Sequence, residues 1–176
     1  MRVRDHVAIS TAAAALSRRW LGRDAALLWA GAVLIDFDHY LAFWLQERRV
    51  SPAAALRFYS RPAVPDHWAT RAFHTPFSIL AVSCLGARLG RFRAVALGMW
   101  LHVALDASHE TRMNRARSAA LERDNRTCQA CGAHAPEVAT HVTQQPWVLP
   151  SYRPTNVVSL CAPCHARAHE TQASPA

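Results

Sequence analysis

Two pairs of cysteines in the last third of the chain have the residue types and the spacing of a metal site. Cys128 and Cys131 form one CxxC pair, Cys161 and Cys164 form the other, and 29 residues separate the pairs. Two such pairs supply four thiolates, the ligand set of a tetrahedral zinc site. The total of five cysteines is odd and suits a disulfide framework poorly, so we expect a reducing compartment. The spacing predicts a structural zinc ion that provides much of the folding free energy of a small region.

The stretch NVVSLCAPCHARAHE, which begins at Asn156, adds nitrogen ligands beside the sulfur ligands. His165 and His169 are four residues apart, so a helix after Cys164 would place both imidazoles on one face. His141 lies in EVATHVT, whose β-branched residues favour a strand, and Asn156 lies in a loop before a second strand or turn. A strand, a loop and a helix are thereby predicted to converge on one divalent cation.

The segment RDNRTCQACG…ATHVT…PTNVVSLCAPCHARAH resembles the HNH endonucleases, the ββα-metal family, in their zinc-stabilised form. The resemblance covers roughly residues 121–170. It implies that His141 is the general base that activates water and that Asn156 orients the loop and the base. It also implies that His165 and His169 hold a catalytic Mg²⁺, Mn²⁺ or other divalent cation, that the four cysteines hold zinc, and that the substrate is DNA.

One position departs from the family pattern. The family commonly carries a His or Asp metal ligand directly before its catalytic histidine, and Thr140 stands there in this chain. A neutral hydroxyl is a much poorer ligand, so an active nuclease and a module that only binds nucleic acid both stay open. The formal net charge of +8, carried without any lysine, and the pI of about 10.2 favour a polyanionic partner. Four arginines of the module are predicted phosphate contacts: Arg123, Arg126, Arg153 and Arg167.

The first 110 residues contain a second set of metal-ligating residue types inside apolar runs. His102 and Asp106 are four residues apart and would share one helix face, where such residues can build a hydrolytic metal centre in a helical bundle. The order DHVAIS…LIDFDHYLAF…RAFHTPFSIL…GMWLHVALD resembles the membrane-bound metal-dependent hydrolases of bacteria over about residues 5–110. This resemblance implies a second metal site formed by His6, Asp36, Asp38, His39, His74, His102 and Asp106.

The composition changes near residue 110 and predicts a mainly α chain with two regions. We expect an N-terminal helical bundle over 1–110, a connecting helix over 111–120, the HNH module over 121–170 and a frayed tail over 171–176. A hydrophobic content of 51% suffices for a real core. Apolar segments at about 7–16, 25–45, 72–87 and 94–107 are the expected helices of the bundle.

Only the run 25–45 is long enough to span a bilayer, and charged residues occupy its middle. A soluble bundle and a membrane-associated one therefore both stay open. The run 7–16 follows two arginines but lacks a convincing signal-peptide cleavage site, so we expect a cytoplasmic protein, and attachment to the inner membrane stays open.

Three hypotheses on function follow from these patterns. The favoured one is an HNH-type DNA endonuclease with a helical N-terminal region. The second is a membrane-associated metal-dependent hydrolase whose zinc module is a degenerate, nucleic-acid-binding HNH domain. The third is a non-enzymatic DNA-binding zinc protein.

Overall fold

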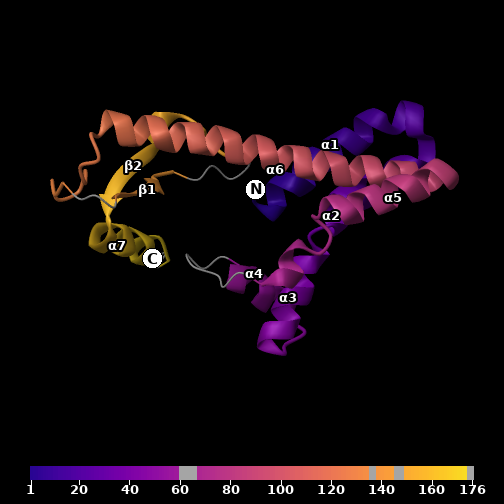
Figure 1. The fold of residues 1–176 in the computed structure, drawn as a ribbon, viewed down its shortest axis with the longest axis horizontal. Helices are drawn as coiled ribbons and strands as arrows, with labels where there is room; N and C mark the ends of the chain where they lie inside the picture. The colour runs from indigo at the N-terminus through magenta and orange to yellow at the C-terminus, as the bar shows by residue number, and fades with distance from the viewer. Residues whose placement is uncertain (60–66, 135–137, 145–148, 174–176) are drawn as a thin grey trace. The chain divides into compact units, whose positions relative to one another are not determined.

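The chain divides into two compact units, Met1–Ala107 (unit 1) and Ser108–Ala176 (unit 2). The computed structural model describes residues 1–59, 67–134, 138–144 and 149–173. Within these residues the chain is mainly helical and contains one small two-stranded sheet, as the sequence predicts (Figure 1).

Unit 1 is built from α-helices. The helices are α1 (Val3–Leu21), α2 (Ala25–Leu34), α3 (Phe37–Glu47), α4 (Pro52–Tyr59), α5 (Pro76–Arg88) and the first part of α6 (Gly90–Arg123), with 3-10 turns at Gly22–Asp24 and Trp68–Arg71. The predicted run 25–45 is divided between α2 and α3, which a turn at Ile35–Asp36 separates. This break places Asp36, Asp38 and His39 at the start of α3.

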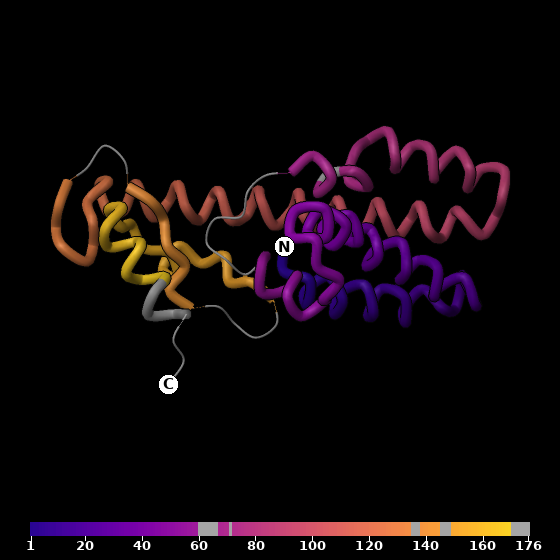
Figure 2. The backbone as a smooth tube through the Cα atoms, turned by 90° about the horizontal axis from the view of Figure 1, so that it is seen from below, coloured from indigo at the N-terminus to yellow at the C-terminus, as the bar shows by residue number. Residues whose placement is uncertain are grey.

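Helix α5 begins with a strong local signal. The Thr75 hydroxyl caps the helix by accepting a hydrogen bond from the Ser78 amide at 3.2 Å, and Pro76 follows the cap. From its end, the chain turns at Leu89 and returns as α6. The two helices lie side by side (Figure 2), and Trp100 Nε1 donates to Ser83 Oγ at 3.2 Å between them.

Two glycines allow α2 and α6 to approach closely. A Cβ at Gly98 would lie 2.1 Å from the Leu28 carbonyl oxygen, and one at Gly31 would lie 2.2 Å from the Val95 carbonyl oxygen. Only glycine fits such backbone contact. The close approach brings His102, one helical turn after Gly98, against the backbone of α2.

Membrane association of unit 1 has weak support in the fold. The stretch Val3–Glu47 contains an 18-residue window whose length and apolar composition suffice to cross a bilayer. Of that window, 39% is buried inside the protein, and the core helix of a soluble protein meets the same criteria.

Unit 2 combines the last turns of α6 with a hairpin and a final helix. Strands β1 (Val138–Val142) and β2 (Val157–Cys161) pair antiparallel, with His141 opposite Val158 and Thr140 opposite Ser159. A 3-10 turn at Pro154–Asn156 precedes β2, and α7 (Ala162–Ala173) follows it (Figure 1). Of the predicted tail, residues 171–173 belong to α7, and residues 174–176 lie outside the described residues.

The sheet of unit 2 has two distinct faces, because side chains alternate along a strand. Val157 packs against Ala116 and Ala120, so one face is turned towards α6. Leu160 packs against Cys164, with Val158 and Ala168 beside them, so the other face is turned towards α7.

Candidate metal centres

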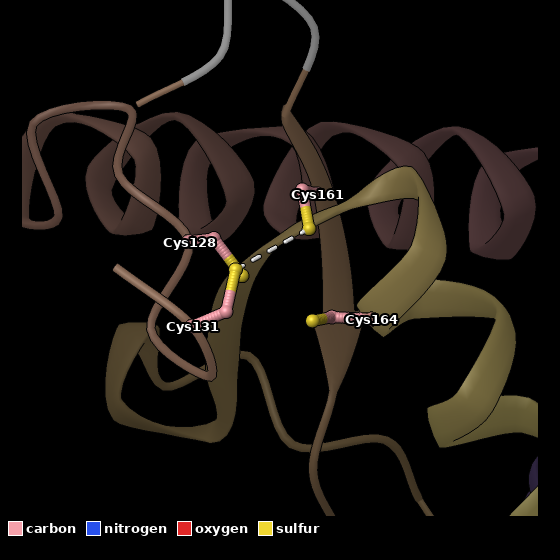
Figure 3. A group of neighbouring side chains, drawn as sticks. All are labelled: Cys128, Cys131, Cys161 and Cys164. Carbon is pink, nitrogen blue, oxygen red and sulfur yellow. Dashed lines mark hydrogen bonds between the residues drawn. The ribbon is translucent and has the colours of Figure 1, made fainter. Parts of the chain in front are cut away.

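The four cysteines of the two CxxC pairs meet in unit 2 (Figure 3). Their sulfur atoms all lie within 4.8 Å of one another. Cys131 Sγ and Cys161 Sγ are 3.7 Å apart. A tetrahedral zinc ion with Zn–S bonds of about 2.3 Å separates its sulfur ligands by about 3.8 Å. The cluster thus has the donor atoms and the size of a structural zinc site, and it agrees with the predicted one.

A tight turn forms the first half of the cysteine cluster. The Gly132 amide donates to the Cys128 carbonyl at 2.8 Å, and the Cys128 amide donates to the Ala133 carbonyl at 2.9 Å. Gly132 has a φ of 73°, a conformation that favours glycine. The turn folds Cys128 and Cys131 back towards the pair on β2 and α7.

The electrostatics of the cluster favour a bound cation. A backbone hydrogen bond from Cys161 lowers the pKa of the Cys128 thiol to about 6. A backbone hydrogen bond from Cys164 lowers the pKa of Cys161, but burial and the neighbouring sulfur atoms raise it to about 11. One thiolate therefore opposes ionisation of the next, and a divalent cation would remove that repulsion.

A second cluster in unit 2 consists of three histidines. His141 on β1 and His165 and His169 on α7 bring their ring nitrogens within 4.8 Å of one another. The Nε2 atoms of His165 and His169 are 3.2 Å apart, close to the separation of about 3.3 Å between two nitrogen ligands of a tetrahedral ion. Burial and the neighbouring imidazoles lower the pKa of His141. Burial lowers the pKa of His165 as well, so both rings favour the neutral form, which is the form that binds metals.

Asn156 closes the loop between the two strands. Its Oδ1 accepts hydrogen bonds from Thr143 Oγ1 and the Gln144 amide, both at 2.9 Å, and its Nδ2 donates to the Gln144 carbonyl at 2.8 Å. The side chain thus ties the start of β2 to the residues that follow β1. This contact fixes the end of β1 at Val142, one residue after His141.

The four arginines predicted to contact DNA have different surroundings. All four residues are exposed, and two of them also donate hydrogen bonds inside unit 2. Arg123 donates to the Pro154 and Val157 carbonyls, both at 2.9 Å, on either side of Asn156. Arg167 donates to Cys164 Sγ at 3.0 Å, which raises the pKa of the guanidinium. Arg123 and Arg167 therefore have structural contacts inside unit 2.

The seven residues of the predicted N-terminal metal site also come together, within unit 1. Six of them form three overlapping groups of ligands, each with its donor atoms within 4.8 Å: His6, Asp36 and His102; Asp36, His39 and His74; and His74, His102 and Asp106. Six ligand residues exceed the four that one tetrahedral ion requires. The arrangement can therefore hold two neighbouring cations.

The seventh residue, Asp38, orients two of the histidines. It is fully buried, and its carboxylate is 2.7 Å from His39 Nδ1 and 2.9 Å from His74 Nδ1. His102 Nδ1 lies 2.8 Å from the Ala32 carbonyl oxygen. With Nδ1 engaged in this way, each imidazole presents Nε2, and the Nε2 atoms of His74 and His102 are 3.1 Å apart. A carboxylate or carbonyl behind a ligating histidine is a common feature of metal sites.

The charges in this N-terminal cluster are strongly coupled. Burial alone would raise the pKa of Asp38, but hydrogen bonds with His39 and His74 lower it to about 2. Burial would lower the pKa of His74, but Asp36 and Asp38 raise it to about 9. Asp106 likewise has a pKa far below its usual range, because the hydrogen bonds with His102 and His6 outweigh its burial. Without a metal, protonated imidazole thus balances the carboxylates.

Two functional contacts escaped the sequence patterns. Asp124 is buried and accepts a hydrogen bond from the Ser159 amide at 3.1 Å while it pairs with Arg123. The Ala32 carbonyl holds His102, which no side-chain pattern can reveal. The available signal for Asp124 was an acidic residue four positions before the first cysteine of a CxxC pair.

No protein-family model, no curated protein and no solved structure matches the chain.

Proposed function

We propose that unit 2 is an HNH-type endonuclease that hydrolyses DNA phosphodiester bonds with a single divalent cation. The observation that carries this proposal is the meeting of His141 from β1 with His165 and His169 from α7, beside a separate four-cysteine cluster. Thiolates prefer zinc, whereas imidazoles accept several divalent cations, so the two clusters are suited to different metals.

The residues around the three histidines have complementary roles in this proposal. A bound divalent cation would neutralise the negative charge that develops on the phosphodiester. His165 and His169 would hold it, one turn apart on α7. Asn156 fixes the loop that leads into β2. Arg126 and Arg153 are exposed and could contact phosphates.

Plasmid cleavage tests the proposal. The purified full chain is incubated with supercoiled DNA and Mg²⁺, Mn²⁺, Ni²⁺ or Zn²⁺ in turn. We expect nicking that His165→Ala abolishes while the cysteine-bound zinc is retained. His134→Ala is the matched control, because His134 is an exposed histidine of the same unit outside the three-histidine cluster. Cleavage by His165→Ala at the wild-type rate would remove the nuclease assignment.

A second candidate function belongs to unit 1. The overlapping ligand groups around Asp36, together with the orienting carboxylate of Asp38, favour a metal-dependent hydrolase centre there. The two candidates separate in one assay with a generic phosphodiester such as bis(p-nitrophenyl) phosphate. Hydrolysis lost in Asp36→Asn but retained in His165→Ala would locate the activity in unit 1, and the opposite pattern would locate it in unit 2.

A further inference from the structure

The pleat of β1 decides which side chain can reach the histidines of α7. Thr140 is paired with Ser159, and by alternation it shares its face with Val142 and Val157. Val157 packs on α6, so Thr140 is directed to the α6 face. His141 is paired with Val158, on the face that packs against α7. A metal ligand at position 140 would therefore point away from His165 and His169.

The three imidazoles are spaced like ligands of one ion. Ring centroids are 5.4 Å apart for His141 and His165, 4.9 Å for His141 and His169, and 4.5 Å for His165 and His169. A metal–nitrogen bond of about 2.1 Å puts each centroid about 3.2 Å from the ion. Two ligating rings at roughly tetrahedral or octahedral angles are then separated by about 4.6–5.3 Å. His141 is thus as close to each α7 histidine as a co-ligand would be.

We infer that His141 is the third nitrogen ligand of the cation held by His165 and His169, and that it replaces the ligand missing at Thr140. The inference deepens the proposed nuclease function and rests on it, but it changes the role of His141 from that of the general base implied by the family resemblance. The donor set becomes three neutral imidazoles from β1 and α7.

The general-base role requires more room than the cluster has. A base acts on a water molecule between itself and the metal, with hydrogen-bond and metal–oxygen distances that place its nitrogen about 4 Å from the ion. A ring so placed would have its centroid about 6–7 Å from the centroids of two ligating rings at octahedral or tetrahedral angles. The observed separations of His141 from His165 and His169, 5.4 Å and 4.9 Å, are shorter than that, and only 7% of His141 is exposed.

Nuclear magnetic resonance on the full chain tests the ligand set without any measurement of activity. The protein, labelled with ¹⁵N in its histidines, is saturated with ¹¹³Cd²⁺, and coupling between cadmium and imidazole nitrogens is recorded. His141→Gln, His165→Ala and His169→Ala assign the three signals. We expect one nitrogen of each of these three rings to be coupled. Thr140→His is the control on the opposite face of β1, and it should add no coupled nitrogen to this set.

Each outcome bears on the inference or on the proposed function separately. Coupling at His165 and His169 without coupling at His141 would overturn the inference and leave the nuclease proposal intact. Coupling at all three rings, without plasmid cleavage under any of the four metals, would support the ligand set and refute the nuclease. Absence of coupling at all three would overturn both. A coupled nitrogen contributed by Thr140→His would refute the assignment of the two faces of β1.

Discussion

Replacement of Gly98 by alanine should separate α2 from α6 and destabilise unit 1. The new Cβ would lie 2.1 Å from the Leu28 carbonyl oxygen and 2.7 Å from the Ala32 amide nitrogen, whereas ordinary contacts begin at 3.4 Å. The helices must therefore move apart by about 1 Å. Overpacking of this kind costs about 1–3 kcal/mol, more than the gain of up to about 1 kcal/mol in helix propensity. For a unit of this size we expect a fall in melting temperature of about 4–15 °C.

The same shift should reach the candidate metal ligands of unit 1. Ala32 also supplies the carbonyl that lies 2.8 Å from His102 Nδ1, so displacement of α2 removes the support of that imidazole. Loss of such a support typically weakens a metal site about 10–100-fold. Gly98→Ala should therefore bind Zn²⁺ or Mn²⁺ less tightly in unit 1 while the cysteine-bound zinc is unchanged.

Thermal melting by circular dichroism and metal titration by calorimetry measure the two effects. Gly90→Ala is the matched control in the same helix, because its Cβ would meet nothing within 4 Å. The control should melt at or slightly above the wild-type temperature. If Gly98→Ala melted with the wild type and bound metal equally well, the close approach of α2 and α6 and the role of the Ala32 carbonyl would both be refuted.

Three further predictions concern zinc, pH and the arginine beside Asn156. Cys131→Ser should lower the zinc content and make unit 2 sensitive to protease, since thiolate ligands supply much of the stability of a small module. Unchanged zinc content and unchanged proteolysis would contradict the four-cysteine site. In the presence of EDTA, unit 1 should lose thermal stability as the pH rises from 6.5 to about 9. Folding raises the pKa of His74, so its contribution to the free energy of unfolding is complete below pH 6.5 and disappears as the ring loses its proton. A melting temperature that stayed constant over this pH range would argue against the His74–Asp38 pair. Arg123→Ala should lower the melting temperature of unit 2, because the Pro154 and Val157 carbonyls and the Asp124 carboxylate lose their hydrogen-bond donor. Arg126→Ala is the control and should not lower it. Equal melting temperatures of the two variants would show that the Arg123 contacts are unimportant.

Local sequence patterns were sufficient to predict the parts of each candidate site that depend on the spacing of residues along the chain. The CxxC pairs predicted a four-sulfur cluster, and four-residue spacing in a helix predicted that His165 and His169 would be neighbours. The β-branched residues around His141 predicted its strand. These features follow from the geometry of a single turn, helix or strand.

Contacts set by tertiary pairing could not be predicted from the sequence. The register of β1 with β2, which directs His141 and Thr140 to opposite faces, depends on two segments that are far apart in the chain. Likewise, the sequence pattern placed Asp38 among the ligands, whereas its contacts with His39 and His74 give it an orienting position. Arg123 is exposed, as expected, but its hydrogen bonds to the Pro154 and Val157 carbonyls, which only the folded loop brings near, could not be predicted.

The packing of Val157 on Ala116 and Ala120 limits how the module with the two candidate metal clusters of unit 2 can be exchanged between proteins. A recombination event or a graft that began at residue 121 would carry all four cysteines and the three histidines. It would leave behind the two alanines that cover Val157, and the hairpin would present an apolar face to water. A transferred segment that keeps its fold must instead begin upstream of Ala116. The last turns of α6 therefore belong to the core of the module and must be transferred with it.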